Sequence, residues 1–386
     1  MKNRLPIAIV VVIAALLAAG LWVWNPPGST KPAAIKVAAN IPLSGPLATY
    51  GVAVREGASM ALAEPAGTGI LQIVVDWQDN ASDPKSAVSI FQKQALDKPT
   101  IYVSGVKPQT MAIKDEVSKI GLPHFVWIFD AQINPQSKNN FRTWVSYKIE
   151  PPIYLDFVKQ RSAKRVAVTY VQLPHTVEEF ERIVVPKLKE QGIDEVFVEP
   201  YDFGRTDFKD IAVKIAKFKP DAIILNGFQG DLVGLIRALR PLDVIKGDNT
   251  IATYDLLDAA KILGADEIEG IRIVAPVFET RPESATIADW RKRFSDKFGR
   301  APLYTHAFAY DMIGAIRAAS KTLTHPATSQ QWLDALRTVN TQGITGPIRF
   351  DADGDMVTPL EIGVYRGGKL VPDTRLSNFM TAPSRQ

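Results

Sequence analysis

Cysteine is absent from the 386 residues of this chain, which excludes disulfide bonds, thiolate nucleophiles, cysteine-based metal sites and lipid attachment through an N-terminal cysteine. Histidine is scarce: His124, His175, His306 and His325 are the whole set, and none stands at a metal-ligand spacing such as HExxH. The sequence also lacks a GxSxG nucleophile motif, a P-loop and a nicotinamide-binding glycine pattern. We therefore expect no enzymatic activity, no metal site and no cofactor.

Acidic residues are missing from the first 34 positions, and this uneven placement explains most of the net charge. Lys2, Arg4 and Lys31 supply +3 of the formal net charge of +4, which leaves +1 for the rest of the chain. A nucleic-acid surface needs concentrated basic charge. We expect no nucleic-acid partner.

An uncharged run of twenty residues begins at Leu5 and ends at Trp24. As a helix it would be about 30 Å long, the thickness of the hydrocarbon core of a bilayer. The cations that precede it would keep the N-terminus in the cytoplasm and place the remainder outside. The sequence predicts an N-terminal hydrophobic helix over 5–24, either an uncleaved membrane anchor or a cleaved signal segment, with the anchor favoured. Residues 1–34 then form this segment and a linker, and the rest is periplasmic, tethered to the inner membrane unless the segment is cleaved.

Short apolar runs alternate with amphipathic stretches from residue 35 onward, a pattern typical of parallel sheets covered by helices on both faces. The runs expected as strands are 35–39, 71–77, 101–104, 124–128, 165–170, 195–200, 222–226 and 270–277. Asp83 followed by Pro84 predicts a helix start, and Thr110 is expected to cap a helix over 111–120. Other helices are expected at 177–191 and 208–218. The number of elements predicts an α/β protein with two doubly wound parallel-sheet lobes.

Three motifs, in order, carry a family resemblance. They are SGPLATYG at 44–51, QDNASDPKSAV at 78–88 and GITGPIRFDADGD at 343–355. They resemble signatures of the periplasmic binding proteins for branched-chain amino acids, and the match covers roughly residues 35–370. The resemblance implies the type I periplasmic fold, with two lobes joined by three hinge strands. We expect 35–148 and 279–325 in lobe 1, 149–278 and 326–376 in lobe 2, and a tail at 377–386.

The resemblance also implies a function. We expect an extracytoplasmic solute-binding protein that captures a small polar ligand, an amino acid or related organic acid or amide, by hinge closure. Its partner would be the permease of an ABC importer in the inner membrane. A membrane-tethered ligand sensor with the same fold is the main alternative. An α/β enzyme is a weaker one, because no catalytic motif is present.

The ligand contacts implied by the resemblance come from loops that follow strands in both lobes. The candidate residues are Tyr50, Lys107, Gln109, Thr110, Phe129, Asp130, His175, Phe228, Gln229, Tyr254 and Asp255. Two alternatives stay open: Thr110 and Asp255 each also suit a helix cap, and Trp127 or Phe129 also suits the core.

Lys107, Gln109, Phe129 and Asp130 stand where the resembling family has small hydroxyl-bearing residues. These replacements predict a ligand with an anionic or strongly polar end and a planar or bulky apolar body. Branched-chain amino acids should bind poorly.

Asp351, Asp353 and Asp355 resemble half of a calcium-binding loop. An EF-hand loop needs glycine at position 6 and glutamate at position 12. Here Gly354 falls at position 4 and Ile362 at position 12. The segment is therefore predicted to be a turn.

Overall fold

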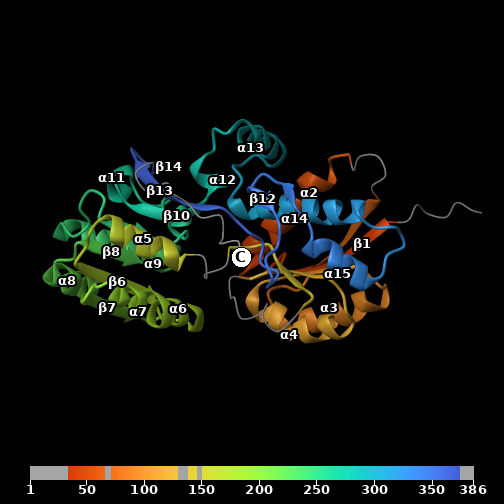
Figure 1. Ribbon diagram of the computed structural model, residues 1–386, viewed down its shortest axis with the longest axis horizontal. Coiled ribbons are helices and arrows are strands. Elements are labelled where there is room, and N and C mark those ends of the chain that lie inside the picture. Colours follow the sequence, from red (N-terminus) through yellow and green to blue (C-terminus); the bar gives the residue numbers. More distant parts are fainter. Residues whose placement is uncertain (1–33, 66–70, 129–137, 146–149, 374–386) are drawn as a thin grey trace, which may run out of the picture.

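The computed structural model describes residues 34–65, 71–128, 138–145 and 150–373. Two lobes lie side by side, each built on one β-sheet covered by helices, and the chain passes three times between them (Figure 1). The expected N-terminal helix over 5–24 and the tail at 377–386 lie outside the described residues, as do Phe129 and Asp130. Among the ranges described, no helix combines the length and apolarity needed to cross a membrane.

The first sheet has the strand order β2-β1-β3-β4-β5, and every neighbouring pair is parallel. Its strands are β1 (Ala34–Ile41), β2 (Gln72–Asp79), β3 (Ile101–Gly105), β4 (His124–Trp127) and β5 (Asn140–Arg142). Its helices are α2 (Ala48–Leu62), α3 (Pro84–Leu96), α4 (Lys107–Lys119), α13 (Ala285–Phe298), α14 (Tyr304–Lys321) and α15 (Ser329–Arg337).

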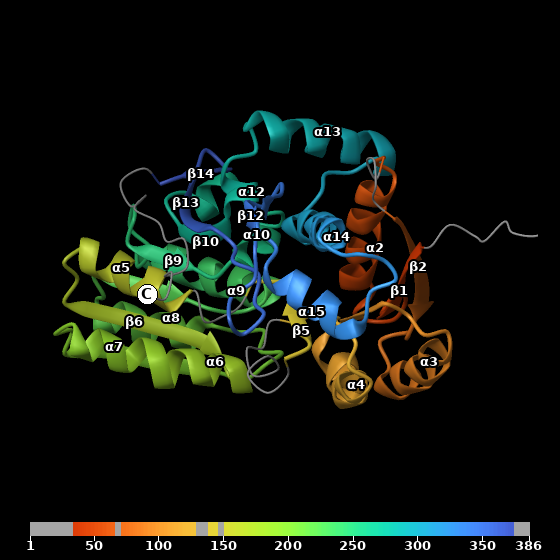
Figure 2. The ribbon, with the colours of Figure 1, turned by 45° about the vertical axis from the view of Figure 1, so that its right-hand side comes forward.

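Alternate side chains of β1 point to opposite faces of this sheet, as the period of a strand requires. Val37 and Ala39 are buried in the same cluster as residues of α2 and α14, which lie side by side in both views (Figures 1 and 2). Ala38 is buried on the other face with Phe91 of α3 and Ile113 of α4. A parallel sheet with both faces covered results, as the near-continuous apolar runs predict.

The second sheet has the order β14-β13-β10-β9-β8-β6-β7. Its strands are β6 (Arg165–Val171), β7 (Glu195–Tyr201), β8 (Ala222–Leu225), β9 (Thr250–Ala252), β10 (Arg272–Pro276), β13 (Leu360–Arg366) and β14 (Lys369–Pro372). The first five run parallel, as expected for a doubly wound parallel-sheet lobe, and β13 adds to this sheet antiparallel to both β10 and β14. Only Gly367 and Gly368, both at positive φ, connect β13 to β14, and so short a turn can join only antiparallel strands.

The remaining elements are short or cover the second sheet. They are α5 (Pro151–Gln160), α6 (Pro174–Glu179), a π-helical turn (Phe180–Val184), α7 (Val185–Glu190), α8 (Lys209–Phe218), α9 (Gln229–Leu239), a 3₁₀ turn (Arg240–Leu242), α10 (Leu256–Ala259), α11 (Ala265–Ile268), α12 (Val277–Thr280), β11 (Thr341–Gln342) and β12 (Pro347–Ile348). Every strand expected from an apolar run is present, with ends within a few residues.

The two expected helix caps have different outcomes. The Asp83 carboxylate accepts a hydrogen bond from the backbone N–H of Ser86 at 2.7 Å, so the predicted cap of α3 is confirmed. Thr110 does not cap α4, because the helix already begins at Lys107. The Thr110 hydroxyl is instead buried and lies 2.9 Å from the Ser104 hydroxyl of β3.

The first two sequence motifs build one interlocked pair of loops. The Asp79 carboxylate, at the end of β2, accepts hydrogen bonds from the backbone N–H groups of Leu43 and Ser44 at 2.8 and 3.1 Å. Gly45 adopts a positive φ of 81°. A Cβ on Gly51 would lie 2.0 Å from the carbonyl oxygen of Pro42, so α2 can start this close to β1 only with glycine there.

The chain leaves the first lobe after β5, returns after β10 and crosses again before β13. The second crossing runs through a short helix, α12, where the sequence predicts a hinge strand. The third comes later than expected. The sequence assigns 326–376 to lobe 2, but α15 packs against α14, and Phe350 contacts Phe125 and Phe141 of the first sheet. Only β13 and β14 of this range join the second sheet.

The acidic segment before β13 forms a turn, as predicted. The Asp351 carboxylate accepts hydrogen bonds from the backbone N–H groups of Asp353 and Asp355, both at 2.9 Å. Asp355 turns away from the other two and forms an ion pair with Arg142.

Candidate ligand-binding cleft

A cavity of about 440 Å³ lies between the two lobes. Its walls come from segments that follow β3, β4, β5, β6, β8 and β9, together with the starts of α2, α5 and α14. In open parallel sheets, ligands bind outside the carboxyl ends of the strands. Here the carboxyl ends of both sheets face one space, which makes this cavity the candidate site.

The first-lobe wall is largely aromatic. Trp144 lies at its centre, with its ring centroid 5.5 Å from that of Trp127, 6.0 Å from Tyr50 and 5.9 Å from Tyr304. Tyr304 in turn lies 5.7 Å from Tyr254 of the second lobe. Interplanar angles of 63° to 80° make each of these contacts edge-to-face. We call this set of rings, Tyr50, Trp127, Trp144, Tyr254 and Tyr304, the aromatic box. The wall therefore offers aromatic faces to a ligand.

The entrance to the cleft also carries aromatic side chains. Tyr50, Phe203 and Phe228 have 40%, 67% and 36% of their surface exposed, and all three line the cavity. Phe203 and Phe228 contact each other edge-to-face, with ring centroids 5.6 Å apart. Large exposed apolar side chains gathered at one cavity mark a binding surface.

The second-lobe wall is polar. His175 and Thr176 come from the start of α6, Asn226 and Phe228 from the end of β8, and Asp255 from the start of α10. The Tyr201 hydroxyl holds this wall by donating to the backbone carbonyl of Asn226 at 2.8 Å. Asp231 holds it by accepting from the Phe228 N–H at 3.0 Å.

Acidic residues dominate the electrostatics of this wall. Glu150 is fully buried before the first turn of α5, and burial raises its pKa well above the ordinary range, with the negative charge of Asp255 as the second cause. Burial, then repulsion by Asp258, raises the pKa of Asp255 to about 7. Glu179 lies buried behind Glu150, and its pKa is raised by burial and by Glu150.

Six of the eleven residues predicted from the sequence line the cavity: Tyr50, Lys107, His175, Phe228, Tyr254 and Asp255. Three others do not line it. Gln109 and Thr110 are buried within α4, and the Gln229 amide donates to the backbone carbonyl of Asp258 at 3.0 Å, which ties α9 to the end of α10. Phe129 and Asp130 lie outside the described residues. Asp255 stands at the N-cap position of α10 but makes no side-chain capping hydrogen bond.

Sequence reasoning missed Glu150, Trp144 and Tyr304. Glu150 had a usable signal, because it directly precedes the Pro151-Pro152 pair that marks the first crossing between lobes. Trp144 follows β5, a strand of three residues that is too short to stand out as an apolar run. Tyr304 begins a helix far along the chain, and only the tertiary structure brings it beside Trp144.

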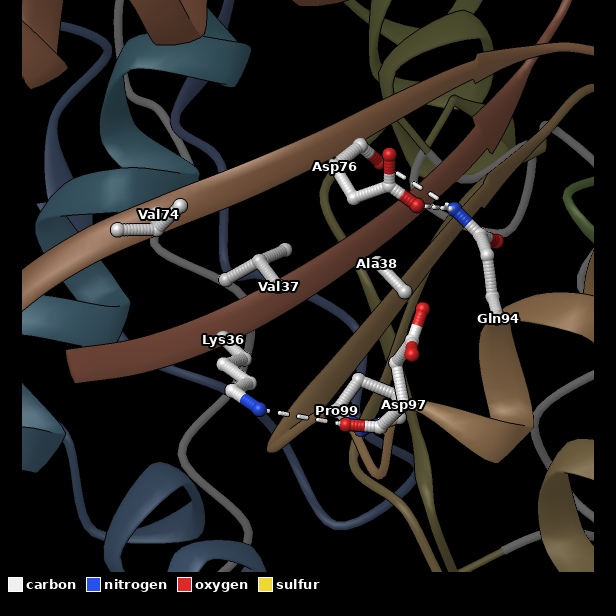
Figure 3. A pocket seen from close by; sticks show the side chains of 8 residues that line it. All are labelled: Lys36, Val37, Ala38, Val74, Asp76, Gln94, Asp97 and Pro99. Atoms are coloured by element: carbon white, nitrogen blue, oxygen red, sulfur yellow. Dashed lines mark hydrogen bonds between the residues drawn. The ribbon is translucent and has the colours of Figure 1, made fainter.

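A second, smaller cavity of about 270 Å³ lies on the first lobe beside the amino-terminal half of β1 (Figure 3). Its polar groups bond to one another: the Gln94 amide donates to the Asp76 carboxylate at 2.8 Å, and Lys36 Nζ donates to the carbonyl of Asp97 at 3.4 Å. It does not lie where strands of a parallel sheet end, so we do not assign it the main site.

Two α/β lobes with a shared cavity at their strand ends define a two-lobed ligand-binding protein. A family model for periplasmic binding proteins matches residues 34–369. The chain therefore belongs to the periplasmic binding protein family, and it is a solute-binding protein. The resemblance seen in the three sequence motifs is confirmed.

Individual relatives are distant. The chain is 25% identical over 346 residues to a Leu/Ile/Val-binding protein of Citrobacter freundii, with 86% of this chain and 90% of that protein covered. It is 24% identical to a Leu/Ile/Val/Thr-binding protein of Salmonella typhimurium, with the same coverage.

Solved structures agree on the fold. A putative branched-chain amino acid ABC transporter protein from Rhodospirillum rubrum superposes with a TM-score of 0.76 at 22% identity, covering 88% of this chain and 100% of that one. A solute-binding protein from R. palustris, solved in complex with benzoate, superposes with a TM-score of 0.71 at 19% identity, covering 88% of this chain and 96% of that one. At these identities the likeness shows the fold alone.

Proposed function

We propose that this protein captures a small polar ligand in the cleft between its lobes and delivers it to the permease of an ABC importer. The observation that carries the proposal is the cavity itself, which is lined from both lobes and has exposed aromatic rings at its entrance. A ligand that contacts both walls favours the state in which they approach each other. The closed form is then the signal that a permease recognises.

The relatives support this role without fixing the ligand. Proteins that bind leucine, isoleucine and valine, and others solved with aromatic acids, share the fold. The lining residues agree with the expectation of an amino acid or a related organic acid or amide, because aromatic faces from one lobe meet polar groups from the other.

Turnover of the ligand has no place in this proposal. Across the described ranges, no group of three or more histidine, aspartate and glutamate side chains is arranged to hold a metal ion. Among the described residues that line the cavity, His175 is the one histidine and none is a serine. These residues therefore do not pair a serine nucleophile with a base.

A thermal-shift screen followed by solution scattering tests the proposal. A ligand that binds only the folded state raises the melting temperature. We expect a compound from a panel of amino acids, amides, amines and small organic acids to do so, and to reduce the radius of gyration. If no compound in a broad metabolite panel binds, the proposed function is wrong.

We also propose that the protein is attached to the inner membrane through residues 5–24 and faces the periplasm. The support is the uncharged length of this run and the cations Lys2 and Arg4 before it. N-terminal sequencing of the protein isolated from cells decides it. A mature start near Leu21 or Ile35 would contradict the anchor and indicate a cleaved signal.

A further inference from the structure

The second-lobe wall of the cleft presents buried hydrogen-bond acceptors that are poorly satisfied by the described residues. The Glu150 side chain is fully buried and lines the cavity, and neither carboxylate oxygen accepts a hydrogen bond of good geometry from a described residue, although the Tyr154 hydroxyl and the Tyr254 N–H lie close enough to lower its pKa. The side-chain oxygens of Asn226 and Thr253 line the same cavity and are also buried without a partner among the described residues. Buried polar atoms in folded proteins are almost always hydrogen-bonded. A ligand that brings N–H donors would satisfy them.

The charges on the cavity walls point to the same kind of ligand. Glu150 and Asp255 both line the cavity, and within the described ranges neither forms an ion pair with lysine or arginine. Asp258 also lines it, but this carboxylate is paired with Lys261 at 2.6 Å. Among the described residues that line the cavity, Lys107 is the one lysine and none is an arginine. A zwitterionic amino acid needs one acid for its ammonium, whereas here two face the ligand space.

The aromatic box suits a cation as well. Tyr254 and Tyr304 meet edge-to-face beside Asp255, whose charge acts on both hydroxyls, and Trp144 contacts Tyr304. Aromatic ring faces attract cations, and the attraction increases when water is excluded. Carboxylates on one side and ring faces on the other form a binding site for a positively charged nitrogen.

We propose that the ligand has a net positive charge, carried by an N–H-bearing ammonium, amidinium or guanidinium group that binds between Glu150 and Asp255 beside the rings of Tyr254 and Tyr304. This proposal rests on the proposed function, since it assigns the ligand class of the same cleft. A quaternary ammonium is disfavoured, because it has no N–H groups for the acceptors of Glu150, Asn226 and Thr253.

A charge series of near-identical shape tests the proposal on the wild-type protein. Benzamidine, benzamide and benzoate share a planar ring and differ mainly in the charge of the substituent, which is positive, neutral and negative. Arginine and citrulline form a second pair that differs in charge at one end. We expect calorimetry to give benzamidine an affinity at least about tenfold tighter than benzamide or benzoate, and arginine a similar advantage over citrulline.

Variants identify the residue that binds the cationic group. Glu150→Gln keeps the shape of the side chain but cannot take up a negative charge when a cation binds, so benzamidine should lose about tenfold or more in affinity while benzamide changes little. Glu190→Gln, at an exposed glutamate in α7 of the same lobe, is the matched control and should leave both affinities unchanged. Thermal melting of each variant shows whether it is folded. If Glu150→Gln does not fold, Asp255→Asn and the charge series on the wild type still decide whether the ligand is cationic.

The outcomes separate the two proposals. If benzoate, benzamide or a neutral amino acid binds and causes closure while the cations do not bind, the cationic ligand is ruled out and the solute-binding function stands. If the charge series shows equal affinities, the cationic ligand is also ruled out. If no compound of the broad panel binds, both proposals fail.

Discussion

The guanidinium Nε of Arg142 lies 3.0 Å from Oδ1 of Asp355, and the Arg142 side chain is completely buried at the end of β5. Backbone hydrogen bonds reinforce this pair: Arg142 N–H donates to the carbonyl of Gly354 at 2.8 Å, and Met356 N–H donates to the carbonyl of Arg142 at 2.9 Å. The segment that leads to the third crossing is thereby attached to the edge of the first sheet, next to the first crossing. The pair thus joins two of the three connections between the lobes.

We predict that Asp355→Ala lowers the free energy of unfolding by about 3–5 kcal/mol, because it removes a carboxylate that pairs with the buried charge of Arg142. Urea unfolding followed by circular dichroism measures the change. Asp194→Ala, at an exposed loop aspartate, is the control and should stay within about 0.5 kcal/mol of the wild type. A loss of less than about 1 kcal/mol for Asp355→Ala would mean that water or other groups replace the ion pair.

The close approach of α14 to Gly57 of α2 predicts a second effect on stability. A Cβ at this position would lie 2.0 Å from the carbonyl oxygen of His306, where α2 and α14 pack together. Alanine is the better helix former by about 1 kcal/mol, but the clash requires α2 and α14 to move apart. We expect Gly57→Ala to destabilise the protein by roughly 1–3 kcal/mol.

Gly230 provides the matched control for that substitution. It lies in the first turn of α9, and a Cβ there would meet no atom within 4 Å. Gly230→Ala should therefore stabilise the protein by about 0.4–1 kcal/mol. Thermal melts of the two variants should shift in opposite directions. Equal shifts of the same sign would show that the α2–α14 contact does not limit the side chain at Gly57.

The strands could be predicted from the sequence because each buried parallel strand requires a continuous apolar run, which is a local feature. The Asp83 cap was readable for the same reason, since aspartate followed by proline determines a helix start within a few residues. Thr110 was misassigned because α4 begins at Lys107, directly after Val106, and no polar side chain marks that start. Local rules identify elements better than their ends.

The binding cleft was only partly predictable. Lys107, His175 and Asp255 were predicted because the family resemblance implies ligand contacts from the loops that follow these strands, where parallel sheets form ligand sites. Trp144 and Glu150 lie between the lobes, where the sequence has neither strand nor helix periodicity. The antiparallel direction of β13 could not be predicted, because the direction of a strand that arrives from the other lobe depends on tertiary structure, not on its apolar pattern.

The raised pKa of Asp255 predicts that the stability of the protein depends on pH. Its pKa is raised from 3.8 to about 7, because burial and the nearby carboxylates of Asp258 and Asp231 disfavour the charged form. The folded state therefore binds a proton more tightly than the unfolded state does. The contribution of Asp255 protonation to the free energy of unfolding is fully present below about pH 4, and it is lost as the pH rises through 7.

We expect Asp255→Asn to raise the free energy of unfolding of the ligand-free protein at pH 8 by roughly 1–3 kcal/mol, since it removes an unfavourable, half-buried charge. The difference from the wild type should shrink as the pH falls to 5. Comparing the variant with the wild type cancels the opposite contributions of His124 and His306, whose pKa values are lowered by burial. Chemical denaturation at pH 5, 6, 7 and 8 measures the effect. A pH-independent difference would mean that Asp255 stays charged throughout.

Branched-chain amino acids should bind this protein poorly, although its relatives include proteins named for binding them. The Thr110 hydroxyl, which could hold a carboxylate, is buried against Ser104, and Val106, Lys107 and Pro108 face the cavity instead. Pro108 has no N–H, so the start of α4 offers one donor fewer to an anion. A carboxylate left without its donors costs about 1–3 kcal/mol for each unsatisfied group.

We predict dissociation constants for leucine, isoleucine and valine weaker than about 0.1 mM, or ~5.5 kcal/mol of binding free energy. Calorimetry on the wild type and on Lys107→Ala tests this prediction. If Lys107 is the main carboxylate partner, the variant should weaken any residual leucine binding further, because none of the described lining residues is an arginine that could replace it. Micromolar leucine binding that survives Lys107→Ala unchanged would contradict the prediction. The carboxylate would then be held by donors outside the segment that opens α4.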